Sequence, residues 1–370
     1  MKNKKSFDQM LFAVALILSV FGLIMVFSAS SPAALALEND SFHYVKKQAI
    51  GVFLGLVAMF FTMKLDYSKY KRLGLIAVVV SAILLAMVFI PGIGVESYGA
   101  KRWIGIGSIT LQPSELAKFS LVLFAACYFS KNPDRVNGLV SILPVLGVGA
   151  LFCVLIILEP NMSITMCVGM LLVGLLVVSG VKWGYIAMLI VPIVLLVPIL
   201  IIVEPYRLSR LSAFLNPWAS PKGEGYQLLQ SLYALGSGGW FGVGIFNSRQ
   251  KFEFLPFSES DFILSVIGEE LGFVGVVIMF AAMLFLIYRG IKTAAEAKDL
   301  FGSILASGIT LIYAIQVVIN ALVVSGSIPP TGLPLPLISS GNTSVIVFLA
   351  AFGVLYNISA SKNSVNYLQG

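Results

Sequence analysis

An aspartate at the junction between two kinds of sequence is the first candidate for catalysis. Asp261 ends a long mixed stretch and directly precedes the apolar run that starts at Phe262. A carboxylate there can cap a helix, because Asp accepts hydrogen bonds from the free N–H groups of the first turn. If the same carboxylate faces a cavity, it can take a proton from an attacking hydroxyl as a general base. From the residues alone, both interpretations stay open.

Other charged side chains fall inside apolar segments, where ionisable residues are costly and commonly functional. Glu115 and Lys118 are three residues apart, so on a helix they lie on one face. They predict a self-neutralising pair that holds helices together, or a pair facing a polar cavity where Lys118 meets an anionic ligand. These two interpretations are compatible.

Two adjacent acids follow Asp261 along the same apolar run. Glu269 lies eight residues after Asp261, about 12 Å deeper on a helix and on nearly the same face. Two glutamates side by side are too costly to face lipid, so we expect a structural hydrogen-bonding role for at least one of Glu269 and Glu270. Glu269 also remains a candidate for substrate binding.

Cations accompany these acids. Arg207 and Arg210 stand three apart near the end of an apolar run, and Arg102 lies in a short loop. Arginine forks suit phosphate oxygens, although an arginine at the end of a span can equally reach lipid headgroups. Acids, cations and apolar walls together fit an amphipathic ligand with an anionic headgroup, such as a lipid-linked pyrophosphate.

The composition requires a membrane to position these residues. Hydrophobic residues make up 58% of the 370 residues, charged residues 11%, and the mean hydropathy is +0.97. One histidine and three cysteines exclude a His/Cys zinc site and a disulfide scaffold, and we predict no metal-ligating residues. The net charge of +7 does not indicate nucleic acid, because the basic residues sit mostly in short loops between apolar segments.

A helix needs about 20 apolar residues to cross a bilayer. Segments of this kind predict an all-α polytopic membrane protein with about ten transmembrane helices, and residues 1–370 as a single integral membrane domain. The expected spans are about 10–30, 46–64, 73–91, 113–130, 138–158, 161–180, 184–203, 262–288, 301–325 and 342–360.

The orientation follows from Lys and Arg in the loops. With the N-terminus inside, 14 of these residues face the cytoplasm and nine face outward, and five of those nine belong to one long loop. Because long loops count little, the short loops split 14 to 4, which predicts cytoplasmic N- and C-termini. The long connection, residues 204–261 between the seventh and eighth spans, is then a large extracytoplasmic loop, for which we expect short amphipathic helices such as 225–235.

A second outer segment, 326–341, is rich in Pro and Gly and carries no charge. It predicts extended, rigid backbone, which at membrane depth must be covered by protein or line a wet cavity. No convincing internal repeat is present, and this weakens a transporter built from inverted repeats.

At these residues the chain resembles the SEDS proteins, the family of FtsW, RodA and SpoVE, over its whole length. Five blocks, in order, carry the resemblance. They are Gly22–Ser30; Arg102-Trp103-Ile104 with Gln112–Lys118; Phe214–Trp218 with Gly225-Tyr226-Gln227 and Asn247–Lys251; Asp261-Phe262-Ile263 with Ile267–Gly272; and Pro329–Pro336 with Ile338-Ser339.

The resemblance implies the SEDS fold and a peptidoglycan glycosyltransferase that polymerises lipid II, a disaccharide-peptide on undecaprenyl pyrophosphate, on the outer face of the bacterial cytoplasmic membrane. It implies a class B penicillin-binding protein as the crosslinking partner, with other division or sporulation membrane proteins. Asp261 corresponds to the family's essential aspartate, and Glu115 and Lys118 to its pair in the fourth span. The form of the first span and of 329–332 favours FtsW or SpoVE over RodA, and hence the division or spore septum.

The chain departs from the family pattern at three places: Glu259-Ser260 replaces His-Thr, Asn161 replaces an aspartate, and Ser340-Gly341-Asn342 replaces Tyr-Gly-Gly. Glu259 puts a second carboxylate near Asp261, which predicts a raised pKa for Asp261.

On this interpretation Asp261 accepts the proton of the acceptor sugar hydroxyl in an inverting transfer, while Arg207, Arg210 and Lys118 stabilise the departing pyrophosphate. The sequence identifies no cofactor with certainty, and a divalent ion, Mg²⁺ or Mn²⁺, is compatible with the chemistry. The alternatives are a lipid II flippase, which needs access from both membrane faces, and a non-catalytic division scaffold, in which Asp261 is dispensable.

Overall fold

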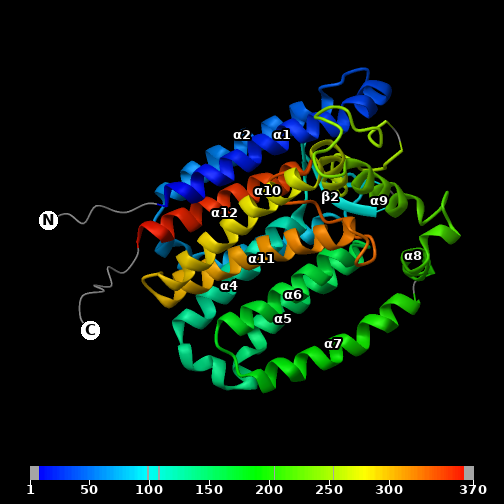
Figure 1. Ribbon diagram of the computed structural model, residues 1–370. Coiled ribbons are helices and arrows are strands. Elements are labelled where there is room, and N and C mark those ends of the chain that lie inside the picture. Colours follow the sequence, from blue (N-terminus) through cyan, green and yellow to red (C-terminus); the bar gives the residue numbers. More distant parts are fainter. Residues whose placement is uncertain (1–7, 98–99, 107–108, 204, 253, 362–370) are drawn as a thin grey trace.

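The computed structural model describes residues 8–361 except 98–99, 107–108, 204 and 253. Within these ranges, ten long helices form an elongated bundle (Figure 1), and each coincides with one expected span to within a few residues at most ends. They are α1 (Gln9–Glu38), α2 (His43–Lys64), α3 (Gly74–Met87), α4 (Pro113–Lys131), α5 (Leu139–Leu158), α6 (Met162–Val178), α7 (Trp183–Val203), α10 (Ile263–Ala295), α11 (Leu300–Val324) and α12 (Asn342–Ala360).

Six of these helices have the length and apolar character of membrane spans. In the described part of the chain, α1, α2, α5, α10, α11 and α12 are each long and apolar enough to cross a membrane, and α3 and α6 are shorter apolar helices. Large apolar side chains on the outside, such as Phe53, Phe61 and Leu75, are more than half exposed. A surface of that kind is stable against lipid and not against water, which confirms the membrane class predicted from composition.

The start of α1 and the end of α12 lie at the same end of the bundle, and the longest connection lies at the other (Figure 1). In that connection α8 (Pro205–Leu215) and α9 (Tyr226–Gly238) flank a single-turn 3₁₀ helix, η3 (Pro217–Ala219). The short helix expected at 225–235 is therefore present as α9. Two further 3₁₀ turns, η1 (Tyr67–Arg72) and η2 (Pro133–Asn137), join α2 to α3 and α4 to α5.

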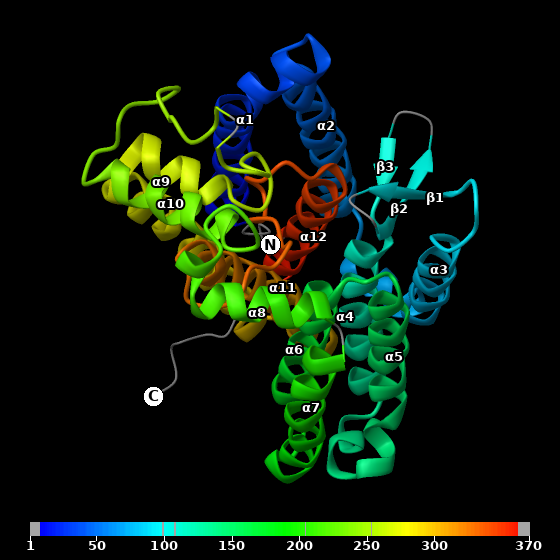
Figure 2. The same ribbon diagram turned by 90° about the vertical axis from the view of Figure 1, so that its right-hand side faces the viewer.

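A small antiparallel sheet between α3 and α4 departs from a purely helical prediction. Its strands are β1 (Gly94–Ser97), β2 (Ala100–Ile106) and β3 (Ile109–Leu111), in the order β1-β2-β3. Val95 pairs with Trp103, and Gly105 pairs with Thr110. Seen from this end, the sheet lies on one side of α12, and α9 and α10 lie on the other (Figure 2).

Helix α10 contains a sharp kink at Gly272, where φ is +66° and ψ is −171°. A Cβ atom there would lie 2.3 Å from the backbone nitrogen of Gly242, so only glycine fits. The turn of α10 before the kink packs against the loop that follows α9, because the backbone nitrogens of Val243 and Gly244 donate to the carbonyls of Glu269 and Glu270. The loop 239–252 thereby lies against residues 269–272 of α10.

The segment 326–341 is extended and irregular, as its prolines predict. Leu333, Leu335, Leu337 and Ile338 are almost completely buried among the helix ends. Neighbouring residues of the same segment line a cavity. This backbone was expected to be covered by protein or to line a cavity, and parts of the segment do each.

Candidate active site

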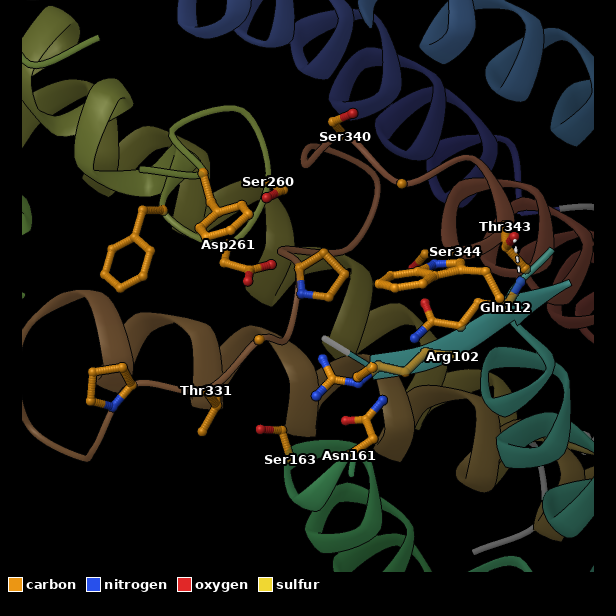
Figure 3. A pocket seen from close by; sticks show the side chains of 18 of the residues that line it. Arg102, Gln112, Asn161, Ser163, Ser260, Asp261, Thr331, Ser340, Thr343 and Ser344 are labelled. Atoms are coloured by element: carbon orange, nitrogen blue, oxygen red, sulfur yellow. Dashed lines mark hydrogen bonds between the residues drawn. The ribbon is translucent and has the colours of Figure 1, made fainter. Parts of the chain in front are cut away.

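A polar cavity of about 680 Å³ lies at the end of the bundle that carries the sheet and the long connection. Its walls come from β2, the turn between α5 and α6, the loop before α10, residues 330–334 and the start of α12. Figure 3 shows Asp261 on one side of this space and Arg102 and Asn161 on the other. The volume is that of a site for a small molecule or for the headgroup of a larger one.

Asp261 is in the loop directly before α10, and its carboxylate reaches the cavity (Figure 3). The pKa of Asp261 is raised to about 7, first because burial disfavours the charged form and second because Glu259 adds a like charge. Arg102 and Arg210 act in the opposite direction. The prediction that Glu259 raises this pKa is confirmed, with burial as the larger cause.

The carboxylate of Asp261 accepts no hydrogen bond from the rest of the described chain. Phe262 is the N-cap of α10, and no side chain caps that helix. The helix-capping alternative therefore has no counterpart in the structure, and the carboxylate is left available to a ligand.

Two of the expected cations reach the cavity. Arg102 projects from β2, and its Nη2 donates to the carbonyl oxygen of Pro160 at 2.6 Å. Arg210 lines the cavity from α8 and is exposed. Arg207 lies one turn earlier in α8, and its side chain is outside the described residues. The cavity thus carries a carboxylate and two guanidinium groups within one space.

Glu115 and Lys118 are brought together but lie outside the lining of the cavity. Lys118 Nζ donates to Glu115 Oε1 at 2.6 Å, and both side chains are fully buried. The structure thus supplies the self-neutralising pair. Contact of Lys118 with a ligand stays a prediction.

Glu269 is also outside the cavity lining, because its carboxylate is used by the loop 239–252. It accepts hydrogen bonds from the hydroxyl of Ser248 and from the backbone nitrogens of Arg249 (3.0 Å) and Gln250 (3.3 Å). The structural hydrogen-bonding role expected for one of the two glutamates is therefore present. Binding of substrate by Glu269 stays a prediction without a contact to support it.

Glu270 completes this anchor. Its Oε1 accepts from Lys251 Nζ at 2.9 Å and from Ser28 Oγ of α1 at 2.6 Å. Lys251 and Glu270 are 4% and 0% exposed. Glu269 and Glu270 of α10 thus bind the loop 239–252, and Glu270 also binds α1.

The uncharged side chains that line the cavity were not among the predicted site residues. Trp103 and a set of amides and hydroxyls do so, namely Gln112, Asn161, Ser163, Asn342, Thr343 and Ser344. Asn161 also caps α6, because its Oδ1 accepts from the backbone nitrogen of Ile164 at 3.3 Å. The available signals were that Trp103 and Gln112 fall within blocks that carry the family resemblance, and that Asn161 and Asn342 fall at departures from the family pattern.

Sequence comparison places the whole chain in one family. Residues 8–364 match the family model of FtsW, RodA and SpoVE, described as "Cell cycle protein". The chain is 39% identical over 358 residues to the probable peptidoglycan glycosyltransferase FtsW of Trichlorobacter lovleyi, covering 96% of this chain and 93% of that protein. It is also 39% identical over 360 residues to stage V sporulation protein E of Bacillus subtilis, covering 96% and 98%.

This chain belongs to the FtsW/RodA/SpoVE family.

Solved structures agree with that membership. A chain from a peptidoglycan synthase complex, studied for its coordination of polymerization and crosslinking, superposes with a TM-score of 0.79 at 28% identity, covering 96% of this chain and 98% of that one. The rod shape determining protein RodA of Thermus thermophilus superposes with a TM-score of 0.71 at 24% identity, covering 97% and 98%, and this likeness concerns the fold. The FtsW/RodA/SpoVE chain described here is accordingly a multi-pass membrane protein with the SEDS fold.

Proposed function

We propose that this protein is a peptidoglycan glycosyltransferase that polymerises lipid II into glycan strands on the outer face of the cytoplasmic membrane. The proposal rests on one observation: the carboxylate of Asp261 and the guanidinium groups of Arg102 and Arg210 line the same cavity. In the described chain, that carboxylate has no hydrogen-bond partner. A base and cations for a leaving group are the two requirements of glycosyl transfer from a pyrophosphate.

The chemistry assigns each group one task. The 4-hydroxyl of an incoming lipid II attacks C1 of the terminal sugar of the growing strand, and Asp261 accepts the hydroxyl proton. The bond from C1 to the pyrophosphate oxygen breaks, and undecaprenyl pyrophosphate leaves with the bonding electron pair. Arg102 and Arg210 stabilise the charge that develops on its oxygens. A single displacement of this kind inverts the configuration at C1.

A pKa of about 7 suits Asp261 to this task, because a general base is most effective when its pKa lies near the working pH. A carboxylate of ordinary pKa would be ionised but only weakly basic.

The described residues contain no group of three or more His, Cys, Asp or Glu side chains able to hold a metal ion. We therefore assign no residue of the described chain as a metal ligand.

The names of the relatives support a proposal for the cellular setting. One curated relative bears an FtsW name, one bears a sporulation name, and one structural relative comes from a complex that couples polymerization to crosslinking. We infer that this chain acts as one membrane domain at the division or spore septum, beside a class B penicillin-binding protein that crosslinks its product. A fluorescent fusion at midcell or at a spore septum supports this placement, and uniform sidewall signal contradicts it in favour of a RodA-like role.

The orientation can be tested independently. The short-loop charge split supports an outward-facing 204–261 loop and cytoplasmic termini. A cysteine introduced at Ser220, in a background lacking Cys127, Cys153 and Cys167, should react with an impermeant maleimide on intact spheroplasts. Labelling that requires permeabilised membranes would reverse the orientation.

The function is tested with the purified protein and its crosslinking partner, supplied with fluorescent lipid II. We expect glycan strands that a muramidase degrades. A lipid II flippase instead makes no strands but moves labelled lipid II between the leaflets of reconstituted vesicles. Transport without polymerisation would overturn the proposal.

A further inference from the structure

Three consecutive backbone carbonyls around Asp261 are each held by a hydrogen bond from a distant part of the chain. The carbonyl of Glu259 accepts from the backbone nitrogen of Ser340 at 2.8 Å. The carbonyl of Ser260 accepts from Ser339 Oγ at 2.6 Å, and that of Asp261 from Asn320 Nδ2 at 2.9 Å. These last two donors lie 79 and 59 residues away along the sequence.

The two side-chain donors, Asn320 and Ser339, are themselves buried and held by further hydrogen bonds. Asn320, on α11, is 1% exposed, and its Nδ2 also donates to the carbonyl of Leu333 at 2.9 Å. Ser339 is 2% exposed, and its hydroxyl accepts from the backbone nitrogen of Leu335 at 2.8 Å. Each side chain therefore joins the loop of Asp261 to the outer segment 326–341.

A third anchor ties that segment to the bundle. Gln48 of α2 is fully buried, and its Nε2 donates to the carbonyl of Ser339 at 3.0 Å. Its Oε1 accepts from the backbone nitrogen of Gly341 at 3.1 Å. The donors to residues 259–261 are thus tied to two long helices of the bundle, α2 through Gln48 and α11 through Asn320.

The backbone at both sides of this contact is strained. Phe257 and Leu337 have φ angles of +58° and +68°, in the left-handed region that residues other than glycine rarely adopt. Strain of this kind persists only where the surroundings fix the conformation, and it gathers at functional sites. Here one strained residue, Phe257, lies just before the acceptors at 259–261, and the other, Leu337, lies just before the donors at 339 and 340.

These contacts hold the aspartate without using its carboxylate. Every one of the three bonds goes to a main-chain oxygen, so both carboxylate oxygens remain available to a substrate hydroxyl. At the same time the opposite wall comes close, because a Cβ at Gly332 would lie 3.3 Å from Asp261 Oδ2.

We infer that Asn320 and Ser339 are positioning residues for the transfer reaction: they clamp the backbone of residues 259–261 so that the Asp261 carboxylate faces the cavity. This inference rests on the proposed function, in which Asp261 is the base. The clamp also holds Asp261 in its partly buried position near Glu259, and this burial and this like charge are what raise its pKa.

The test of the clamp compares two variants of Ser339, one that loses the hydroxyl and one that keeps it. Ser339→Ala deletes one oxygen atom, and Ser339→Thr keeps it. Ser327→Ala is a matched control, because Ser327 is an exposed serine of the same outer segment, and its hydroxyl bonds to that of Ser325 at 2.9 Å. Purified variants are assayed with lipid II for kcat, KM and the pH dependence of both, and their melting temperatures are measured.

We expect Ser339→Ala to lower kcat about tenfold or more with KM within about twofold of wild type, and to shift the acidic limb of the kcat profile to lower pH as water reaches Asp261. Ser339→Thr and Ser327→Ala should keep the wild-type profile. Asn320→Leu removes a different donor of the same set and should reproduce the Ser339→Ala result.

A second readout needs no turnover. The pH dependence of carbodiimide labelling at Asp261, followed by mass spectrometry, should shift to lower pH in Ser339→Ala and Asn320→Leu. Unchanged labelling and an unchanged kcat profile in these variants would overturn the clamp while leaving the glycosyltransferase intact. Absence of glycan synthesis by the wild-type protein would instead contradict the proposed function, and the labelling would still decide the clamp.

Discussion

Asp261 and Glu269 lie only eight residues apart, yet the carboxylate of Glu269 is bound by its surroundings and that of Asp261 is not. The loop 239–252 supplies Glu269 with three hydrogen-bond donors. Asp261 receives bonds to its backbone only, and its carboxylate faces a cavity with two arginines. A satisfied buried carboxylate stabilises a fold, and an unsatisfied one at a cavity is free to react.

Glu115, like Glu269, is a buried carboxylate that already has a partner within the protein, because it pairs with Lys118. Glu115→Ala leaves Lys118 as an unpaired charge in a fully buried site, which can cost about 3–5 kcal/mol. We expect a sharply lower folded yield, measured by size-exclusion chromatography in detergent. The reversed pair, Glu115→Lys with Lys118→Glu, should recover part of that yield. A fully folded and active Glu115→Ala variant would show that the pair has no structural role.

Glu269→Gln is the intermediate case. The amide has one acceptor oxygen where the carboxylate has two, so at least one of the donors from residues 248–250 loses its partner. A buried donor left unsatisfied costs about 1–3 kcal/mol. The melting temperature should fall by several degrees, while kcat at a permissive temperature stays near that of wild type. A selective loss of kcat with unchanged stability would instead assign Glu269 to substrate.

The pH profile sharpens the comparison at Asp261. Its raised pKa means that the base form is lost as pH falls through about 7, so kcat should drop about tenfold per unit below that point. Burial also raises the pKa of Glu259, which adds a like charge near Asp261 when ionised. Glu259→Gln removes that charge and should move the acidic limb to lower pH by less than about one unit. A limb that does not move would mean that burial alone sets the pKa.

Gly332→Ala should have the smallest effect. The added methyl group would stand 3.3 Å from Asp261 Oδ2, closer than ordinary contact, so a small shift is required. We expect a loss of a few-fold in kcat with little change in melting temperature. Full activity would show that the wall formed by 330–334 yields freely, and that the close approach to Asp261 has no role.

The helices were predictable because a helix that crosses a bilayer needs about 20 consecutive apolar residues, and such a run can be recognised directly in the sequence. Asp261 was predictable for a similar reason, since it stands where the apolar run of α10 begins. Its pKa was predictable in direction, because Glu259 is a near neighbour in the chain.

Other features depend on contacts that the sequence does not display. The sheet at 94–111 has short strands interrupted by glycines, and its stability comes from pairing in space. The partners of Glu269 are mostly backbone N–H groups about 20 residues away, which every residue except proline carries. Ser344 is an uncharged residue at a helix start, where such residues are common as caps, so its place in a cavity wall left no separate signal.

The central claim is that Asp261 is the catalytic base, and one substitution tests it most directly. Asp261→Asn keeps the size of the side chain and removes its basicity at neutral pH. With melting temperature and partner binding unchanged, glycan synthesis from lipid II should fall about 10²–10⁴-fold, and it should stay low in the Glu259→Gln/Asp261→Asn double mutant. Wild-type glycan synthesis by the double mutant, at matched protein levels, would contradict the account.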